Sequence, residues 1–181
     1  MLKYIIRDIY AVLRFLPYGI VAGVVVLIFL EIRNHYRFRR GKEPLPIPAA
    51  VSFYTYLAIM LAITYFSRES GNGKIDMKLF STLGINNRNN AYVVENILLF
   101  IPYGIVCPWY FEKLRGFFKN ALAGFLTTVV IECLQLVTGR GVFQIDDILT
   151  NLLGSIIGWF LFRLVFDTRR GKTPGEGDQT V

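Results

Sequence analysis

Residues 44–67 read PLPIPAAVSFYTYLAIMLAITYFS, a stretch of 24 residues that contains no Asp, Glu, Lys or Arg. A helix that spans a bilayer needs about 20 consecutive, mostly apolar residues. This stretch exceeds that length and therefore predicts a transmembrane helix. Four further charge-free stretches cover residues 15–30, 96–111, 120–131 and 148–162. The stretch 120–131 reaches spanning length only as residues 117–137, which places Glu132 inside the apolar segment.

The composition of the whole chain also indicates a membrane protein. Of the 181 residues 54% are apolar and 18% are charged, and the mean hydropathy is +0.45, whereas a soluble domain carries about a quarter charged residues. These values exclude a disordered chain, and two cysteines exclude a disulfide scaffold. Cys107 and Cys133 fall in opposite halves of their spans and are expected to remain unpaired. The sequence predicts an all-α, polytopic bundle of about five transmembrane helices.

The chain divides into three predicted parts. Residues 1–16 place Lys3, Arg7 and Arg14 on one face of a short amphipathic helix, which is typical of an element in the membrane interface. Residues 17–166 carry the five spans, and the polar, glycine-rich residues 167–181 predict a disordered tail. Of the 20 basic residues, 12 lie on the side of the first connection and the C-terminus, and 8 lie on the other side. Because Lys and Arg accumulate on the cytoplasmic side, this bias predicts an external N-terminus.

Polar residues of the last three predicted spans, and of the loop before the last span, gather at the face of the membrane opposite the basic connections. The set comprises Asn96, Glu132, Gln135, Arg140, Asp146, Asp147 and Asn151. Glu132 and Gln135 lie three residues apart and therefore share one helix face. Because a carboxylate in hydrocarbon is costly, Glu132 is expected to face protein or water and to serve a function. Together these side chains predict a binding cluster at the outer boundary of the membrane.

Two glycines extend the polar stripe of the last span toward its other end. Asp147, Asn151, Gly154 and Gly158 follow one another at steps of four, three and four residues, so they share one face. Gly154 and Gly158 form a small-xxx-small motif, which lets another helix approach closely. The fourth span, residues 117–137, is the expected neighbour.

Several of these residues also admit a purely structural role. Asp146 or Asp147 caps the last span in the simplest interpretation. Arg140 is either a solvated loop charge or the partner that neutralises the carboxylate of the fourth span. The three amides of the cluster, Asn96, Gln135 and Asn151, either take part in binding or only form hydrogen bonds between helices. Pro102 is expected to kink the third span, with Gly104 easing the bend.

Three ordered blocks resemble the VanZ-like membrane protein family. They are NILLFIPYG at residues 96–104, ECLQ at 132–135, and residues 140–158 with their arginine, aspartates, asparagine and two glycines. The similarity covers about residues 92–159, with one departure: Gln144 stands where the family often has an aspartate. The resemblance implies a multi-pass protein of the bacterial cell membrane that is associated with reduced susceptibility to teicoplanin and related lipoglycopeptide antibiotics.

Two functions fit these residues, and the favoured one is non-enzymatic binding. In that hypothesis the cluster engages a cell-wall precursor lipid, another lipid-linked envelope component or the lipoglycopeptide antibiotic, with Arg140 on a phosphate or carboxylate. The bundle accommodates membrane lipids and the acyl or prenyl tails of the ligand. The alternative is an intramembrane hydrolase or transferase that uses Glu132 and Asp147 as an acid/base pair or as ligands of a divalent cation.

The sequence offers little for other classes of protein. It contains no HExxH zinc pattern, no glycine-rich phosphate loop and no GxSxG elbow. Its single histidine, His35, lies in the connection opposite the cluster. The sequence therefore predicts no cofactor, no metal and no nucleic-acid partner. A transporter stays open as a third class, although no inverted repeat favours it.

Overall fold

The computed structural model describes residues 2–66, 74–81, 84 and 86–170. Within these residues, five helices are long and apolar enough to cross a membrane: α2 (Leu16–Arg39), α3 (Ile47–Phe66), α4 (Asn87–Tyr110), α5 (Phe117–Thr138) and α6 (Ile145–Arg170). A shorter helix, α1 (Leu2–Leu13), precedes them. The predicted helical membrane fold with five spans is confirmed. The position of α1 in the membrane interface stays a prediction.

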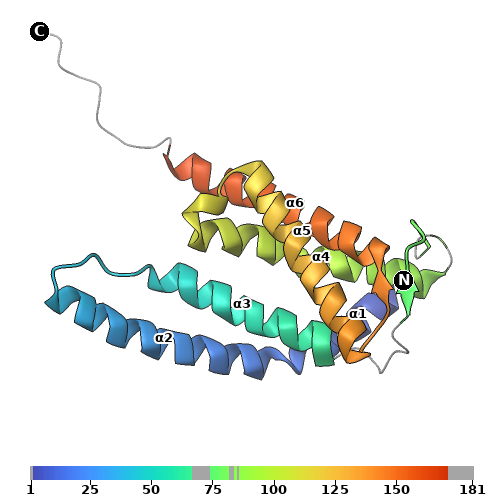
Figure 1. Cartoon of the computed structure of the whole chain (residues 1–181), viewed down its shortest axis with the longest axis horizontal. Helices are drawn as coiled ribbons and strands as arrows, with labels where there is room; N and C mark the ends of the chain where they lie inside the picture. Colours follow the sequence, from blue (N-terminus) through green and yellow to red (C-terminus); the bar gives the residue numbers. More distant parts are fainter. Residues whose placement is uncertain (1, 67–73, 82–83, 85, 171–181) are drawn as a thin grey trace, which may run out of the picture.

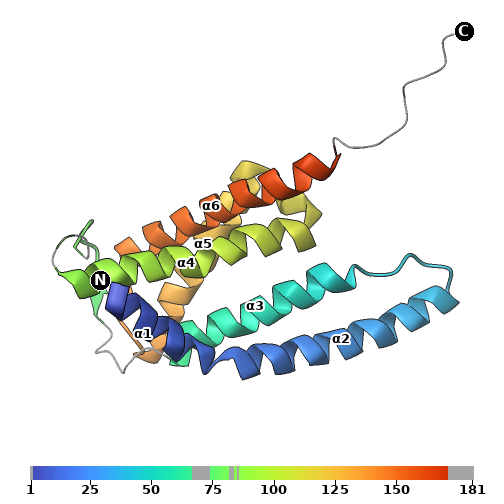
Figure 2. The same cartoon turned by 180° about the vertical axis from the view of Figure 1, so that it is seen from behind.

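The helices form two groups that lie side by side (Figure 1). The antiparallel hairpin of α2 and α3 lies next to a group of α4, α5 and α6, and Figure 2 shows the same arrangement from behind. Helices α4 and α6 run alongside each other, and α5 crosses them obliquely so that its last turns reach the end of α3. The end of the bundle that holds the first turns of α4 and α6 and the last turns of α3 and α5 is called the polar end below.

Short elements join the long helices. A 3-10 turn, η1 (Glu112–Leu114), leads from α4 into α5. The strands β1 (Ile75–Asp76) and β2 (Phe143–Gln144) pair in parallel at the polar end, with Ile75 opposite Phe143. These strands could not be predicted from the sequence, because two residues are too few to show a strand period.

Glycines set the close contact of α4 with α6. A Cβ on Gly154 would overlap the carbonyl oxygen of Ile97, and one on Gly158 would overlap that of Ile101. The small-xxx-small motif therefore packs α6 against α4, and the prediction that α5 is its neighbour was wrong. The physical reason lies on α4: Gly104 presents a bare backbone to α6, and a Cβ there would overlap backbone atoms of the facing helix. Two such surfaces fit each other.

Gly104 has a packing role that was not predicted. Helix α4 continues through Pro102 and Pro108, and the kink expected at Pro102 stays a prediction. Gly104 is buried where the backbones of α4 and α6 meet, so the absence of a side chain there serves the helix contact.

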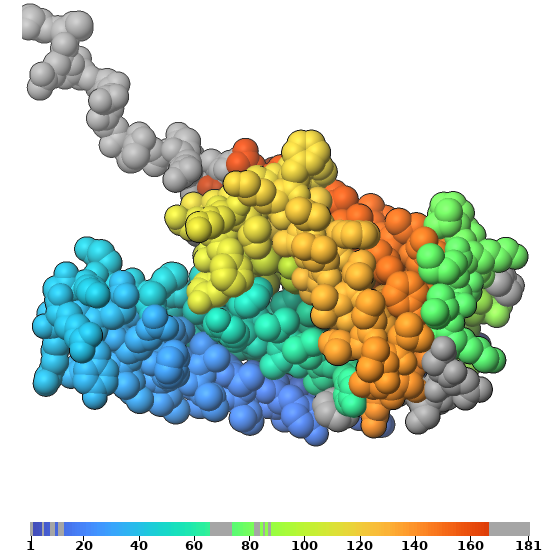
Figure 3. Space-filling view, in the orientation of Figure 1, coloured from blue at the N-terminus to red at the C-terminus, as the bar shows by residue number. Residues whose placement is uncertain are grey.

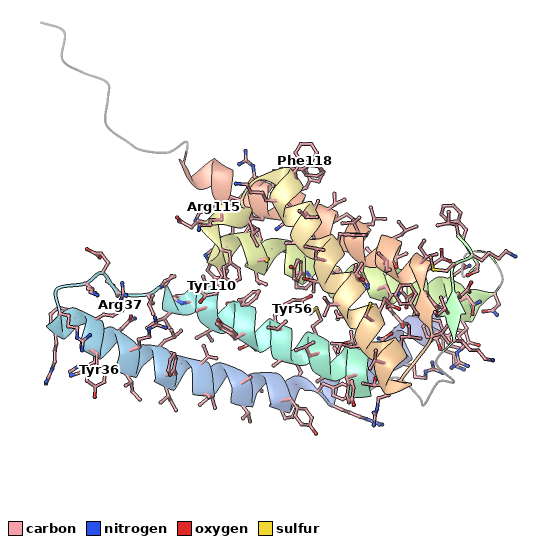
Figure 4. The ribbon with its side chains drawn as sticks, viewed as in Figure 1. Tyr36, Arg37, Tyr56, Tyr110, Arg115 and Phe118 are labelled. Carbon is pink, nitrogen blue, oxygen red and sulfur yellow. The ribbon has the colours of Figure 1, made fainter. Side chains whose placement is uncertain are left out.

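A buried core joins α3 to α4 and α5. Phe53 and Met60 of α3 pack with Phe100 and Tyr103 of α4, together with Cys107 and Ile131. Tyr56 points from α3 toward the α4–α6 group (Figure 4), and its hydroxyl donates to the Leu99 carbonyl oxygen at 2.8 Å. Cys107 and Cys133 are both free thiols, as predicted. This core fixes the end of α3 against α5 and so positions the groove described below.

The helices at both ends of the membrane domain are longer than the charge-free stretches. Helix α2 continues to Arg39 and so carries much of the basic run on its last turns. Helix α6 continues to Arg170, so residues 167–170 of the predicted tail are helical. The remainder of that tail, residues 171–181, lies outside the described residues. In Figure 4, Arg37 and Arg115 both lie at the end of the bundle opposite the polar end.

Candidate functional site

The first turn of α6 holds two buried carboxylates. The Asp147 carboxylate accepts a hydrogen bond from the Asn96 side-chain nitrogen at 2.8 Å, which joins α6 to α4. The Asp146 carboxylate accepts one from the Phe80 backbone N–H at 2.7 Å. Both positions stabilise a negatively charged side chain, because the positive end of the helix dipole lies at the first turn of α6. Beyond the role expected for them at the start of the helix, these residues bond α6 to α4 and to the connection before α4.

The last turns of α5 contribute Glu132 and Gln135, which are 1% and 2% exposed. Glu132 faces protein, as expected, and its Oε2 accepts the Gln144 backbone N–H at 3.1 Å. The Gln135 Nε2 donates to the Thr64 carbonyl oxygen at 3.1 Å, which joins α5 to α3. Among the described residues the Gln135 Oε1 is buried without a hydrogen-bond partner. This amide thus retains acceptor capacity at the α3–α5 contact.

Arg140 lies beyond the end of α5, which Gly139 terminates with a left-handed φ of 64°. Its guanidinium carbon is 4.6 Å from the centroid of the Tyr65 ring, within the range of a cation–π contact. Its Nη1 is 3.5 Å from the Tyr65 carbonyl oxygen. Within the described part of the chain the guanidinium of Arg140 contacts Tyr65, whereas Glu132, the partner considered from sequence, accepts the Gln144 backbone N–H. Arg140 remains partly exposed.

A buried polar seam continues from the cluster between α5 and α6. Asn151 Nδ2 donates to Thr128 Oγ1 at 2.8 Å. One turn further on, Ser155 Oγ lies 3.4 Å from Asn120 Oδ1. Asn151 was predicted from the sequence as a site residue, whereas Thr128, Ser155 and Asn120 were not. Their spacing could have indicated them, because positions 120, 124, 128 and 132 follow one another at steps of four, as do 147, 151 and 155.

The structure places the predicted residues toward one end of the bundle, where Asn96 bonds to Asp147 and the others bond to residues outside the predicted set. Glu132, Gln135, Asp146, Asp147 and Asn151 are all buried. Their recorded bonds join α3, α4, α5, α6 and the connection before α4. Among the described residues no three His, Cys, Asp or Glu side chains gather to hold a metal ion. Arg140, by contrast, is partly exposed and lies beside an open surface.

That open surface is a groove of about 460 Å³. It is lined by Tyr18 of α2, by Ala58, Leu61, Ala62, Thr64 and Tyr65 of α3, and by Ile131, Leu134 and Gln135 of α5. The walls are mainly apolar, and the volume falls in the range of about 300–1,000 Å³ that is typical of small-molecule sites. Gln135 and Tyr65, the residue under Arg140, lie at its polar end. The groove could not be predicted from the sequence, because it forms between residues far apart in the chain.

Comparison with known proteins matches residues 53–166 to the model of the VanZ/LLP1 family. The match covers more than half of the chain and includes all seven residues of the predicted cluster. The chain belongs to the VanZ/LLP1 family. The expected core, residues 92–159, lies within the match, and α1 and α2 lie before it. The α3 and α5 walls of the groove are part of the VanZ/LLP1 region, whereas Tyr18 precedes it.

One relative is "Protein VanZ" of Enterococcus faecium. It is 26% identical to this chain over 76 residues, which are 42% of this chain and 47% of that protein. The aligned segment thus spans about half of the relative. No solved structure matches this chain.

Proposed function

We propose that this VanZ/LLP1 protein binds an amphiphilic molecule in the membrane, with an alkyl chain in the α3–α5 groove and a polar group at Arg140. The candidate ligands are a lipid-linked cell-envelope component and a lipidated glycopeptide of the teicoplanin type. Resemblance to VanZ, a protein linked to teicoplanin resistance, supports the second. The observation that carries the proposal is the groove whose polar end lies beside a partly exposed arginine.

The chemistry of the groove supports an elongated apolar ligand. Leu61, Ile131 and Leu134 supply apolar walls, and the alanines at 58 and 62 leave the space between them. Because lipid tails are as apolar as leucine, the groove alone gives little selectivity in a membrane. Selectivity is expected from the polar end of the ligand.

Arg140 provides the polar contact. A guanidinium donates paired hydrogen bonds to a phosphate or carboxylate, and stacking on Tyr65 holds its plane in place. The unpartnered Oε1 of Gln135 adds an acceptor for a hydroxyl or amide after a small side-chain rotation. In this proposal the buried carboxylates Glu132 and Asp147 hold the helix ends in position and do not touch the ligand.

A matched pair of arginines tests the polar contact. Arg88 also lies at the polar end and also contacts a tyrosine, with its guanidinium carbon 5.7 Å from the Tyr92 ring centroid. Arg140→Gln is expected to weaken binding of fluorescent teicoplanin or of a purified precursor lipid in nanodiscs, and Arg88→Gln is expected to leave it unchanged. Equal effects of the two substitutions, at matched membrane abundance, would contradict the proposed contact.

A second pair of variants tests the groove. Ala58→Phe fills it, whereas Val130→Phe places the same ring on the exposed face of α5. Only Ala58→Phe is expected to lower the affinity for the ligand. If both variants bind as the parent protein does, the alkyl chain does not occupy this groove. Susceptibility to teicoplanin of cells that carry the four variants then shows whether binding and resistance change together.

A further inference from the structure

The connection between α3 and α4 exposes a run of large apolar side chains outside the five spans. Ile75, Met77, Leu79 and Phe80 are 59%, 62%, 52% and 64% exposed. These four residues are called the apolar loop below. Scattered apolar side chains on a surface need no explanation, but a contiguous set marks an interaction surface. In Figure 3 this green segment stands out from the polar end beside the start of α6.

The apolar loop is held firmly to the bundle. Strand β1 pairs with β2, and the Phe143 backbone N–H donates to the Lys74 carbonyl oxygen at 3.0 Å. The Phe80 backbone N–H donates to the buried Asp146 carboxylate at 2.7 Å. Asp76 accepts the Lys78 backbone N–H at 3.0 Å and the Ser81 hydroxyl at 2.8 Å, and these bonds hold the turn together. The exposed side chains therefore stand on a defined backbone at the level where α6 begins.

Charge identifies the surface that such a loop fits. Lys74 and Lys78 are exposed and alternate with the apolar residues. Of the nearby carboxylates, Asp146 is buried and Asp76 is partly exposed, so the two exposed lysines leave the outward face apolar with a net positive charge. A surface of this kind matches the boundary of an anionic bilayer, where apolar groups enter the acyl region and lysines meet lipid phosphates.

We propose that the apolar loop inserts into the head-group region of the leaflet at the polar end and anchors the start of α6 there. The occupant is the lipid surface itself. Insertion buries Leu79 and Phe80 among lipid and brings both lysines to the phosphate level. This proposal is independent of ligand binding in the α3–α5 groove, since the loop and the groove share no lining residue.

A fluorescent reporter on the full chain tests the insertion. Cys107 and Cys133 are first replaced by alanine, and an environment-sensitive dye is attached to Leu79→Cys or, as a second reporter, Met77→Cys. The control is Lys42→Cys, an exposed position in the connection at the opposite end. Each protein is placed in nanodiscs that contain brominated lipids, and the water-soluble quencher iodide is added in a separate series.

Brominated lipids are expected to quench the dye at positions 79 and 77 strongly and the dye at position 42 weakly, with the reverse order for iodide. Iodide quenching at 79 and 77 equal to that at 42 would overturn the proposal. Shielding of both loop reporters from lipid and from iodide would also overturn it, because another protein or a second copy of this chain would then cover the loop.

Lipid charge provides a further arm of the experiment. Nanodiscs that contain phosphatidylglycerol are expected to increase lipid quenching at position 79 over nanodiscs of phosphatidylcholine alone. The double variant Lys74→Gln, Lys78→Gln is expected to abolish this increase while quenching in phosphatidylcholine persists. An increase that the double variant retains would overturn the role given to the two lysines.

Discussion

The contact between α4 and α6 makes a quantitative prediction for Gly158→Ala. In a helix interior, alanine is favoured over glycine by about 1 kcal/mol, so local propensity alone predicts a more stable protein. The new Cβ, however, would overlap the Ile101 carbonyl oxygen and lie 2.9 Å from the Cα of Gly104. Both obstacles are backbone atoms that cannot rotate away. Overpacking costs about 1–3 kcal/mol, and the rigid obstacle favours the upper part of that range.

The overlap therefore outweighs the gain in propensity, and the free energy of unfolding is expected to fall by about 1–2 kcal/mol. The assay is unfolding of the purified protein in mixed micelles by titration with a denaturing detergent, followed by circular dichroism. Leu153→Ala, on the exposed face of α6, serves as the control and is expected to change stability little. A Gly158→Ala protein as stable as the parent, or more stable, would refute the close approach of the two backbones.

Three further predictions concern the seam, the loop and the topology. A double-mutant cycle of Asn151→Leu and Thr128→Val is expected to give a coupling energy of about 1 kcal/mol, because the two side chains share a 2.8 Å hydrogen bond. The same unfolding assay measures it, and additive effects of the two substitutions would contradict that bond. Hydrogen bonds from the Lys78 backbone and the Ser81 hydroxyl lower the pKa of Asp76 below its ordinary value. The turn is therefore expected to keep its full stability at any pH above the ordinary pKa, and to loosen only as the pH falls through the lowered pKa. Carboxyl NMR shifts check this, and Ser81→Ala should move the pKa back up. A cysteine at Asn89 is expected to react with an impermeant maleimide added outside cells, whereas labelling only after lysis would reverse the predicted orientation.

Much of the site was predictable because its residues are costly in lipid. Glu132, Asp147 and Asn151 stood out as polar groups within or beside apolar segments, and the structure buries all three at helix contacts. Helical spacing also placed Glu132 and Gln135 on one face. Which partners they meet was not predictable, because a helical period fixes the face of a helix and not the neighbour that covers it.

The glycines and Arg140 show this limit most clearly. Gly154 and Gly158 predict that another helix packs closely on α6, but the sequence does not say which one. The structure identifies α4, whose Gly104 presents a matching bare backbone. Arg140 was expected either to be solvated or to pair with a carboxylate, and the structure places its guanidinium over the ring of Tyr65. The ring comes from a helix 75 residues earlier in the chain.

The helical membrane class, the five spans and the polar residues at one end can all be predicted from local sequence. These follow from local facts: the length of apolar stretches, the cost of charge in hydrocarbon and the period of the helix. Only the tertiary structure shows that α6 packs on α4, that the polar residues bond to α3, to α4 and to the connection before α4, and that a groove opens between α3 and α5. Those features arise from contacts between distant segments, where the shape of both surfaces selects the pairing.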